Sequence, residues 1–316
     1  MSVMKSSIPT IALPGLKRDV SRLILGTDYF KPEIMEQIAP IMDEFVAHGG
    51  NTFDTAKIYS GGESEKALGQ WIRERNNRDK VNVWTKGAHH DANGPRVTPE
   101  KIYEDFMISL ERLQMDYVDM YALHRDDPSV EVGPIIEALN EHIEAGRTLA
   151  IGASNWSYER LQEANDYAAS HGLVGFSFSS PNFSLARAKE PFWAGCVSVD
   201  DDTWAWHNRT KLPVLSWSSQ ARGFFSGRFT PDNHENADLV RVFYSDDNWA
   251  RQRRASELAK EKGVTTIQIA LAYVLNQPFP TCALIGPANS DEMRSCAEAS
   301  RLALTPEEIR WLETGE

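Results

Sequence analysis

Residues 81–124 read VNVWTKGAHHDANGPRVTPEKIYEDFMISLERLQMDYVDMYALH, and the rest of the chain follows the pattern of this segment. The segment begins with an apolar strand, 81–86, and ends with a second one, 116–124. Between them, residues 98–113 have the apolar spacing of a helix, with Thr98 as its cap and a proline in the first helical position. A strand, a helix and a second strand in this order are typical of a parallel sheet with a helical crossover.

The alternation of strands and helices continues along the chain. Further strands are predicted at 22–26, 51–54, 148–154, 172–180, 212–219 and 281–286. Helices are predicted at 33–50, 63–75, 132–147, 158–172, 250–263, 265–277 and 291–300. Pro40 should kink the first of these helices or shorten its start. Eight strand–helix units predict one α/β domain over residues 1–316, a closed (β/α)8 TIM barrel. Residues 8–20 (IPTIALPGLKRDV) are interpreted as an N-terminal β-hairpin that plugs the barrel bottom.

Two long segments, 185–211 and 223–248, interrupt this alternation. Each follows a predicted strand, so both are expected as loops at the carboxyl-terminal face, where barrel enzymes keep their sites. Both are rich in aromatic residues, which argues against disorder. Long loops of this kind in a compact domain are usually functional.

Composition and charge limit the classes of function. A formal net charge of −12 makes nucleic-acid binding through a general basic field unexpected. The first residues lack the apolar stretch of a signal peptide, and no apolar run approaches the roughly 20 residues of a membrane helix. The cysteines Cys196, Cys282 and Cys296 are widely spaced, as in proteins of a reducing compartment. We therefore expect a cytoplasmic protein with neither a membrane nor a nucleic-acid partner.

Four polar residues lie at or just after the ends of predicted strands: Asp54, Tyr59, Lys86 and His124. Taken singly, each has an ordinary structural interpretation, such as a turn aspartate or a lysine that leads the chain into solvent. The carboxyl ends of consecutive barrel strands meet at one face, however, so we interpret the four residues as one site.

An acid, a phenol, an amine and an imidazole are together the parts of a proton relay. A nearby ammonium is expected to lower the pKa of a phenol, about 10 in water, by roughly one to three units. A carboxylate would keep the lysine charged, and the imidazole would hold a substrate carbonyl toward the phenol. Such a site protonates the oxyanion that forms when hydride reaches a carbonyl carbon, and the hydride must come from a cofactor.

The chain resembles the aldo-keto reductase superfamily over nearly its whole length, and in particular its bacterial sugar and aldehyde reductases. The motifs that carry the resemblance are GGNTFDTAKIYSGGESEKALG, VNVWTK, VDMYALHRDD, AIGASNW, LPVLSWSSQARGFFSGRF and IALAYVLNQ followed by LIGPANSDEM. The resemblance implies an oxidoreductase with a barrel fold that transfers hydride between a nicotinamide cofactor, NAD(P)H, and an aldehyde or ketone. It also implies that Tyr59 is the general acid/base, that Lys86 and Asp54 tune it, and that His124 orients the carbonyl.

The resemblance further implies which residues bind the cofactor. Ser154 and Asn155 match the pair that hydrogen-bonds the carboxamide, and Ser180 stands where the family often has glutamine. Trp217 matches the ring that stacks on the nicotinamide. The remaining positions match the segments beside the nicotinamide, over the pyrophosphate and at the adenosine phosphate: Gly26, Thr27 and Asp28; Ser218, Gln220, Arg222 and Gly223; Gly286 and the residues after it.

Both NADPH and NADH remain open as the cofactor. Family members that prefer NADPH usually have arginine or lysine in the loop after the eighth strand, and here that loop reads GPANSDEM. Ala288 stands where a basic residue is common, and the carboxylate of Glu292 suits ribose hydroxyls and repels phosphate. Arg294 either compensates or faces solvent. The family as a whole favours NADPH, whereas these residues favour NADH.

Residues near predicted strand ends favour a small-molecule carbonyl or alcohol substrate, either sugar-like or small and polar. The aromatic candidates for this pocket are Tyr29, Trp84, Trp156, Phe224 and Phe225. Arg125, Asp126 and Asp127 follow His124 and are candidates for hydrogen bonds to a polyol, or are simply solvated. His89, His90 and Asp91 have metal-ligand side chains, but adjacent histidines on a loop point in different directions, so no metal site is expected.

Two other functions are compatible with the pattern. Lys86 at a barrel strand end could form a Schiff base, as in barrel aldolases. Alternatively, the barrel could hold cofactor as a redox-sensing binding subunit with little turnover, as in relatives that attach to membrane channels. Four intact catalytic residues argue against a pure binder. The oligomeric state is left open.

Overall fold

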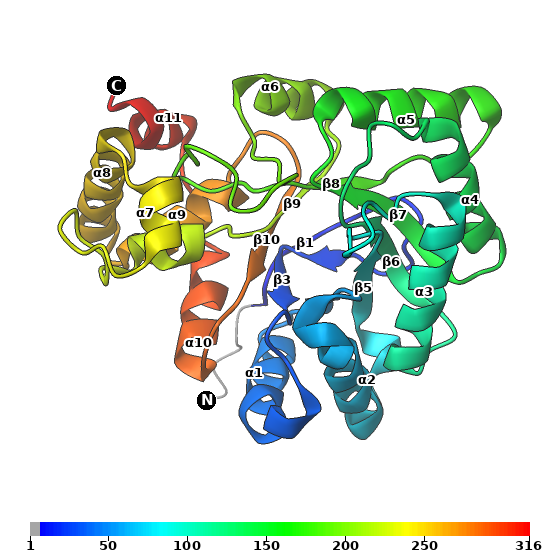
Figure 1. Ribbon diagram of the computed structural model, residues 1–316. Coiled ribbons are helices and arrows are strands. Elements are labelled where there is room, and N and C mark those ends of the chain that lie inside the picture. Colours follow the sequence, from blue (N-terminus) through cyan, green and yellow to red (C-terminus); the bar gives the residue numbers. More distant parts are fainter. Residues whose placement is uncertain (1–6) are drawn as a thin grey trace.

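A computed structural model describes residues 7–316, and its centre is a closed barrel of eight parallel strands (Figure 1). In order around the barrel, the strands are β3 (Leu23–Gly26), β4 (Thr52–Asp54), β5 (Asn82–Gly87), β6 (Val118–Leu123), β7 (Thr148–Ser154), β8 (Phe178–Ser180), β9 (Val214–Ser216) and β10 (Thr281–Ile285), which pairs with β3. The predicted TIM barrel is therefore confirmed.

Helices surround the barrel (Figure 1). They are α1 (Met35–Ala47), α2 (Glu63–Arg75), α3 (Pro99–Leu113), α4 (Val132–Glu144), α5 (Tyr158–His171), α6 (Asp201–Thr210), α7 (Ala237–Phe243), α8 (Asp246–Lys262), α9 (Thr266–Leu275), α10 (Ser290–Ala299) and α11 (Pro306–Thr314). The α-helix α1 continues through Pro40, and a 3-10 turn at Pro32–Ile34 forms the start of the predicted segment.

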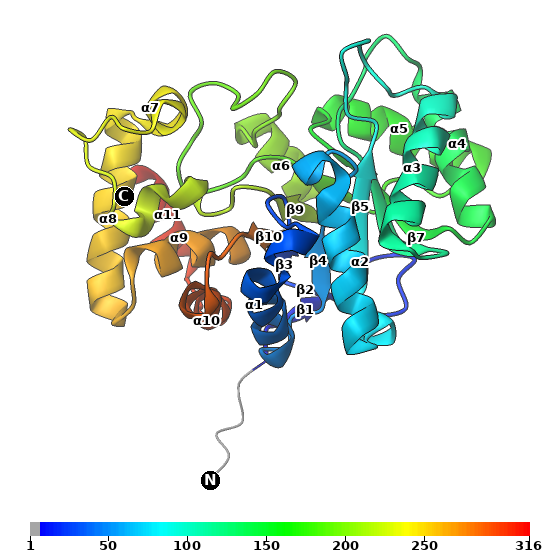
Figure 2. The same ribbon diagram turned by 60° about the horizontal axis from the view of Figure 1, so that its bottom comes forward.

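The N-terminal hairpin lies at the amino-terminal end of the barrel, as predicted. Its strands β1 (Thr10–Ile11) and β2 (Val20–Ser21) pair in antiparallel fashion. Figure 2 shows them at the lower end of the barrel, opposite the long loops at the top. Leu13 and Val20 of the hairpin pack into the same buried cluster as Ile24, Trp84 and Met120 of the barrel strands. The hairpin therefore closes the bottom of the barrel, and the carboxyl-terminal face stays available for a site.

Parts of the interrupting segments are helical. The segment 185–211 contains α6, whose cap Asp200 accepts a hydrogen bond from the Thr203 N–H at 2.8 Å. The segment 223–248 contains α7 and the start of α8. The helix α11 was not predicted, although Thr305 and Glu308 form a capping box at its start. The strands β8 and β9 are shorter than predicted: β8 begins only at Phe178, and β9 extends only from Val214 to Ser216.

Among the described residues, no helix combines the length and apolar character that a bilayer span requires.

Candidate active site

The four predicted catalytic residues meet at the carboxyl-terminal mouth of the barrel. Asp54 is the last residue of β4, Lys86 lies near the end of β5, and His124 directly follows β6. Tyr59 begins the 3-10 segment Tyr59–Gly62 between β4 and α2. The Lys86 ammonium is the centre of the group because it forms an ion pair with Asp54 and donates to the Tyr59 hydroxyl at 3.1 Å.

Lys86 is held in one position by three acceptors. Besides Asp54 and Tyr59, its Nζ donates to the carbonyl of Thr55 at 3.1 Å. The ammonium also lies 4.5 Å from the ring centroid of Trp84, which forms the floor beneath it. An ammonium has three donors, and all three are satisfied here, so Lys86 is fixed beside the phenol.

The segment that carries Tyr59 is anchored at both ends. The N–H of Lys57 donates to the carbonyl of Lys86 at 2.9 Å, and the N–H of Tyr59 donates to Ala56 at 3.0 Å. After Tyr59 the chain enters the left-handed region, with φ of 48° at Ser60 and 98° at Gly62. This reversal leads the chain into α2 and leaves the tyrosine hydroxyl at the lysine.

His124 lies against the ring of Tyr59. The two ring centroids are 5.6 Å apart and nearly perpendicular, and the His124 N–H donates to the carbonyl of Gly87 at 2.8 Å. The side-chain Nδ1 is enclosed without a hydrogen-bond partner. Burial, together with the charges of Lys86 and Arg125, holds the pKa of His124 well below its usual range. The imidazole is therefore neutral at physiological pH, and it can orient a carbonyl without adding charge.

Burial shifts the pKa values of the other three groups. It raises the pKa of Tyr59 well above 10, and the carboxylates of Asp54 and Asp28 raise it further. The pKa of Tyr59 therefore lies above its ordinary value instead of below it, because burial and the two carboxylates favour the neutral phenol. Burial also raises the pKa of Asp54 to about 6 and lowers that of Lys86, and the mutual attraction of the two groups opposes both shifts.

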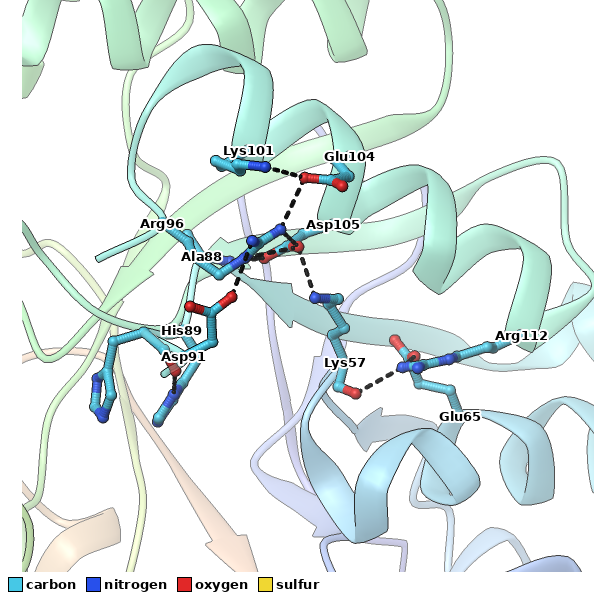
Figure 3. Close-up of polar contacts among 11 residues, drawn as sticks. Lys57, Glu65, Ala88, His89, Asp91, Arg96, Lys101, Glu104, Asp105 and Arg112 are labelled. Carbon is cyan, nitrogen blue, oxygen red and sulfur yellow. Dashed lines mark hydrogen bonds and ion pairs between the residues drawn. The ribbon is translucent and has the colours of Figure 1, made fainter. Parts of the chain in front are cut away.

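A second layer of charges supports the catalytic segment (Figure 3). Asp105 of α3 is almost fully buried and accepts from the Ala88 N–H at 2.9 Å. The same carboxylate pairs with Lys57 at 2.8 Å and with Arg96. Arg112 donates to the Lys57 carbonyl at 2.7 Å. Asp105 thus ties the loop after β5 to the segment that carries Tyr59.

His89 also belongs to the mouth, although its place in a loop predicted a solvated side chain. Its ring lies 4.9 Å from that of His124 and 4.2 Å from that of His90, so the two adjacent histidines lie against each other instead of pointing apart. Burial lowers the pKa of His89 to about 4. Within residues 7–316, no cluster of three or more His, Cys, Asp or Glu residues could hold a metal ion.

The candidate carboxamide-binding residues lie side by side at the ends of β7 and β8. The Ser154 hydroxyl donates to the Ser180 carbonyl at 2.8 Å, and the Asn155 Nδ2 donates to the Ser154 hydroxyl at 3.0 Å. Asn155 has φ of 61° and also donates to the His124 carbonyl at 3.3 Å. The hydroxyl of Ser180 is buried without a partner, as is the Nε1 of Trp217. Two unpaired polar atoms beside these residues fit a site for a polar ring substituent.

The segment after β9 is a tight turn that fits an anion. Ser218, Ala221, Arg222 and Gly223 all have φ between 48° and 87°, a backbone that can direct successive N–H groups toward an anion. Gln220 accepts from the Cys296 thiol at 3.8 Å. Arg222 is exposed and stacks over Phe192 and Trp193 of the loop before α6, at 5.3 and 5.6 Å. The long aromatic loop therefore reaches the candidate pyrophosphate segment.

Three further candidate positions follow β3. Thr27 is fully buried, and its hydroxyl donates to the Asp54 carbonyl at 2.9 Å, so it supports the backbone of the site. A Cβ at Gly26 would lie 3.3 Å from the Ile285 carbonyl. Asp28 is exposed, and its charge reaches Tyr59 and Lys86.

The loop after β10 and the start of α10 are acidic. Gly286 is exposed with open space around it. The Glu292 carboxylate accepts from the Ala288 N–H at 2.9 Å, and Asn289 caps the helix by accepting from the Asp291 N–H at 3.0 Å. Arg294 forms ion pairs with Asp291 and, at 3.5 Å, with Glu44. The one nearby arginine is thus engaged by carboxylates of its own chain.

The candidate substrate residues differ in how much of their side chains is exposed. Trp84 and Phe224 are fully buried, and Trp156 is nearly so, so these rings pack in the interior and present almost no surface to a ligand. Phe225 is buried beside Phe224 in the same way. Tyr29 is exposed, and its hydroxyl donates to the Pro287 carbonyl at 2.9 Å, away from the catalytic group. Arg125 remains at the mouth beside His124.

Comparison with known proteins identifies the family. The family model described as "Aldo/keto reductase family" matches residues 22–314. The chain belongs to the aldo-keto reductase family.

It is 28% identical over 306 residues to the uncharacterized oxidoreductase YrpG of Bacillus subtilis (strain 168), an alignment that covers 93% of this chain and 91% of that protein. It is also 28% identical to a probable voltage-gated potassium channel subunit beta of Arabidopsis thaliana, with 80% and 78% covered. Among solved structures, the glycerol dehydrogenase AKR11B4 from Gluconobacter oxydans has the same fold, with a TM-score of 0.79, 22% identity, and 96% and 93% of the two chains covered.

Membership in the aldo-keto reductase family makes this chain an NAD(P)-dependent carbonyl oxidoreductase that acts on a small molecule. The unpaired Ser180 hydroxyl and Trp217 Nε1, together with the left-handed turn after β9, fit a nicotinamide cofactor at this mouth. Such a cofactor supplies the hydride that none of the protein side chains can provide.

Proposed function

We propose that this chain transfers hydride reversibly between NADH and an aldehyde or ketone, with Tyr59 as the proton donor in reduction. The observation that carries the proposal is the position of the Lys86 ammonium, which contacts Asp54 and the Tyr59 hydroxyl together. Because the phenol oxygen accepts from Lys86, the phenol proton is directed toward another acceptor. A substrate carbonyl at the mouth is such an acceptor.

Each member of the group has a distinct role in this proposal. Tyr59 gives its proton to the carbonyl oxygen during reduction and takes a proton back during alcohol oxidation. Lys86 stabilises the phenolate that remains, and Asp54 keeps Lys86 charged. His124, held neutral, orients the carbonyl oxygen toward the phenol.

The choice of NADH rests on the start of α10. A 2′-phosphate there would meet the carboxylates of Asp291 and Glu292. Arg294, the cation that could compensate, is already paired with Asp291 and Glu44. The hydroxyls of the NADH ribose would instead find hydrogen-bond acceptors in these carboxylates.

The substrate is proposed to be a small polar carbonyl compound, sugar-like compounds included. The support comes from the mouth itself, where His89, His124 and Arg125 present polar groups. The aromatic rings that would suit a large apolar substrate, Trp84 and Phe224, are buried.

A Schiff-base mechanism is less well supported, because Lys86 Nζ has all three donors engaged and its side chain is only 2% exposed. An amine in that position must lose a proton and break these bonds before it can attack. A binding subunit without turnover would have no need for four intact catalytic residues.

The test of the proposal combines binding and turnover. NADH and NADPH are titrated separately by fluorescence, and the tighter cofactor is then used with a panel of aldehydes, ketones and sugars. Cofactor oxidation that depends on a carbonyl supports the proposal. Tight cofactor binding without turnover across the panel would instead favour a binding subunit, and borohydride trapping of substrate on Lys86 would favour an aldolase.

A further inference from the structure

Arg125 is a buried cation beside the catalytic group with no ionic partner. Its side chain directly follows His124 and is 7% exposed. One terminal nitrogen, Nη1, donates to the carbonyl of His124 at 2.9 Å, and Nε is enclosed without any partner. Within residues 7–316, no carboxylate pairs with this guanidinium. A charge held in this way is costly unless an anion is meant to join it.

The two neighbouring acids bond to groups other than Arg125. Asp126, the acid closest in sequence, pairs with Arg160 at 3.1 Å. Asp127 accepts from the hydroxyl of Ser129 at 2.6 Å. Neither acid forms an ion pair with Arg125, so the sequence HRDD places one guanidinium without an ionic partner at the mouth.

Arg125 lies between the catalytic residues and the loop before α6. A Cβ at Gly195, where φ is 73°, would lie 3.7 Å from its Cδ, so this loop passes over the side chain. The guanidinium is also close enough to His124 and Tyr59 for its charge to shift their pKa values. After burial and Lys86, its charge is the next largest influence that lowers the pKa of His124, and it opposes the raised pKa of Tyr59.

We infer that Arg125 binds an anionic group of the substrate, either a carboxylate or a phosphate, so that the natural carbonyl substrate carries a negative charge near its reacting carbon. This inference rests on the proposed function and names the substrate class for the same site. A guanidinium presents a planar fork of donors that suits both anions, and charge-assisted hydrogen bonds of this kind are the strong ones. The overall charge of −12 would repel such a substrate, so a local cation is needed to select it.

The test uses pairs of aldehydes that differ only at one end. One pair is a four-carbon aldehyde ending in a carboxylate and its methyl-ended counterpart, and the other is a triose aldehyde with and without a terminal phosphate. The wild type should show a kcat/KM roughly 10- to 100-fold higher for the anionic member of at least one pair. The pair with the larger ratio tells whether carboxylate or phosphate is the natural group.

Arg125→Gln should remove most of that ratio, and Arg125→Lys should restore part of it. Arg187→Gln is the matched control, because Arg187 is an exposed arginine paired with Asp201 outside the site, and its loss should leave the ratio unchanged. The affinity for NADH is measured in every variant. A loss of NADH affinity in Arg125→Gln with no change in the ratio would mean that the cofactor phosphates are the anion, and would overturn the inference.

Anion binding without turnover separates this inference from the proposed function. Calorimetry with succinate and with inorganic phosphate should detect binding to the wild type with cofactor, and weaker binding to Arg125→Gln. Anion binding that depends on Arg125, without any carbonyl turnover, would support the anion site and contradict the proposed reductase activity. Turnover of neutral aldehydes, with no preference for anionic ones, would support the reductase activity and contradict the anion site.

Discussion

The ammonium of Lys86 donates a hydrogen bond to the hydroxyl oxygen of Tyr59 at 3.1 Å. In the proposed mechanism, a phenol oxygen that accepts from the lysine keeps its own proton available for the substrate. The high pKa of the buried Tyr59 means that the phenol stays protonated at neutral pH. In the proposed mechanism the protonated phenol serves carbonyl reduction, and alcohol oxidation requires a phenolate that Lys86 stabilises.

The rate of reduction should fall as the pH falls through about 6. Burial raises the pKa of Asp54 to about 6, so this carboxyl takes up a proton below that pH and no longer balances Lys86. The kcat/KM of the wild type is measured from pH 5 to pH 8 with a carbonyl whose own charge does not change. Asp54→Asn should be slow at every pH, and its kcat/KM should not fall further as the pH drops through about 6. If Asp54→Asn also lost activity as the pH fell through about 6, that loss would have to come from another titrating group.

The proposed preference for NADH should depend on the carboxylate of Glu292. Its replacement in Glu292→Arg removes a negative charge and adds a positive one beside the proposed ribose, so the ratio of NADPH to NADH affinity should rise roughly 10- to 100-fold. Fluorescence titration of both cofactors measures this ratio.

Glu307→Arg makes the same change of charge in the first turn of α11 and should leave the ratio unaltered. If the wild type bound NADPH more tightly than NADH, the proposed role of the acidic α10 start would be wrong.

Asp105 should stabilise both the fold and the position of Tyr59. Asp105→Ala leaves Lys57, Arg96 and the Ala88 N–H without their buried acceptor, and breaking a buried pair of this kind costs about 3 kcal/mol or more. Urea unfolding should show that loss, and kcat should fall because Lys57 no longer anchors the catalytic segment.

Glu104→Gln provides the comparison, because Glu104 contacts the same Arg96 from the exposed surface (Figure 3). Its loss should leave the free energy of unfolding close to that of the wild type, because an exposed ion pair contributes little. Equal destabilisation by the two substitutions would show that the buried contacts of Asp105 contribute no more to stability than the exposed contact of Glu104.

The barrel and the meeting of Asp54, Lys86 and His124 could be predicted from the sequence because the carboxyl ends of parallel strands meet at one face. The same strand rule explains the burial of Trp84. Residues two apart in a strand point to the same side, so the ring lies in the barrel beneath Lys86, covered by the site instead of lining it. The helix α6 had a signal in its acidic start, Asp200 to Asp202, that was interpreted as part of a loop.

Other features depend on contacts between distant segments. Lys57 and Asp105 are 48 positions apart, and nothing local to either residue indicates their pairing. The pKa of Tyr59 likewise could not be predicted, because the desolvation that raises it depends on how completely the mouth is packed. The lack of an ionic partner for Arg125 could not be predicted either, because it depends on which groups Asp126 and Asp127 contact in the fold.

The most direct measurement of the central claim is the single-turnover rate of Tyr59→Phe with bound cofactor and a reducible carbonyl. If Tyr59 donates the proton, the rate of the hydride-transfer step should fall by roughly 10²- to 10⁴-fold, and the cofactor affinity should stay close to that of the wild type. A rate within about threefold of the wild type would contradict the claim, because it would mean that another group protonates the carbonyl oxygen.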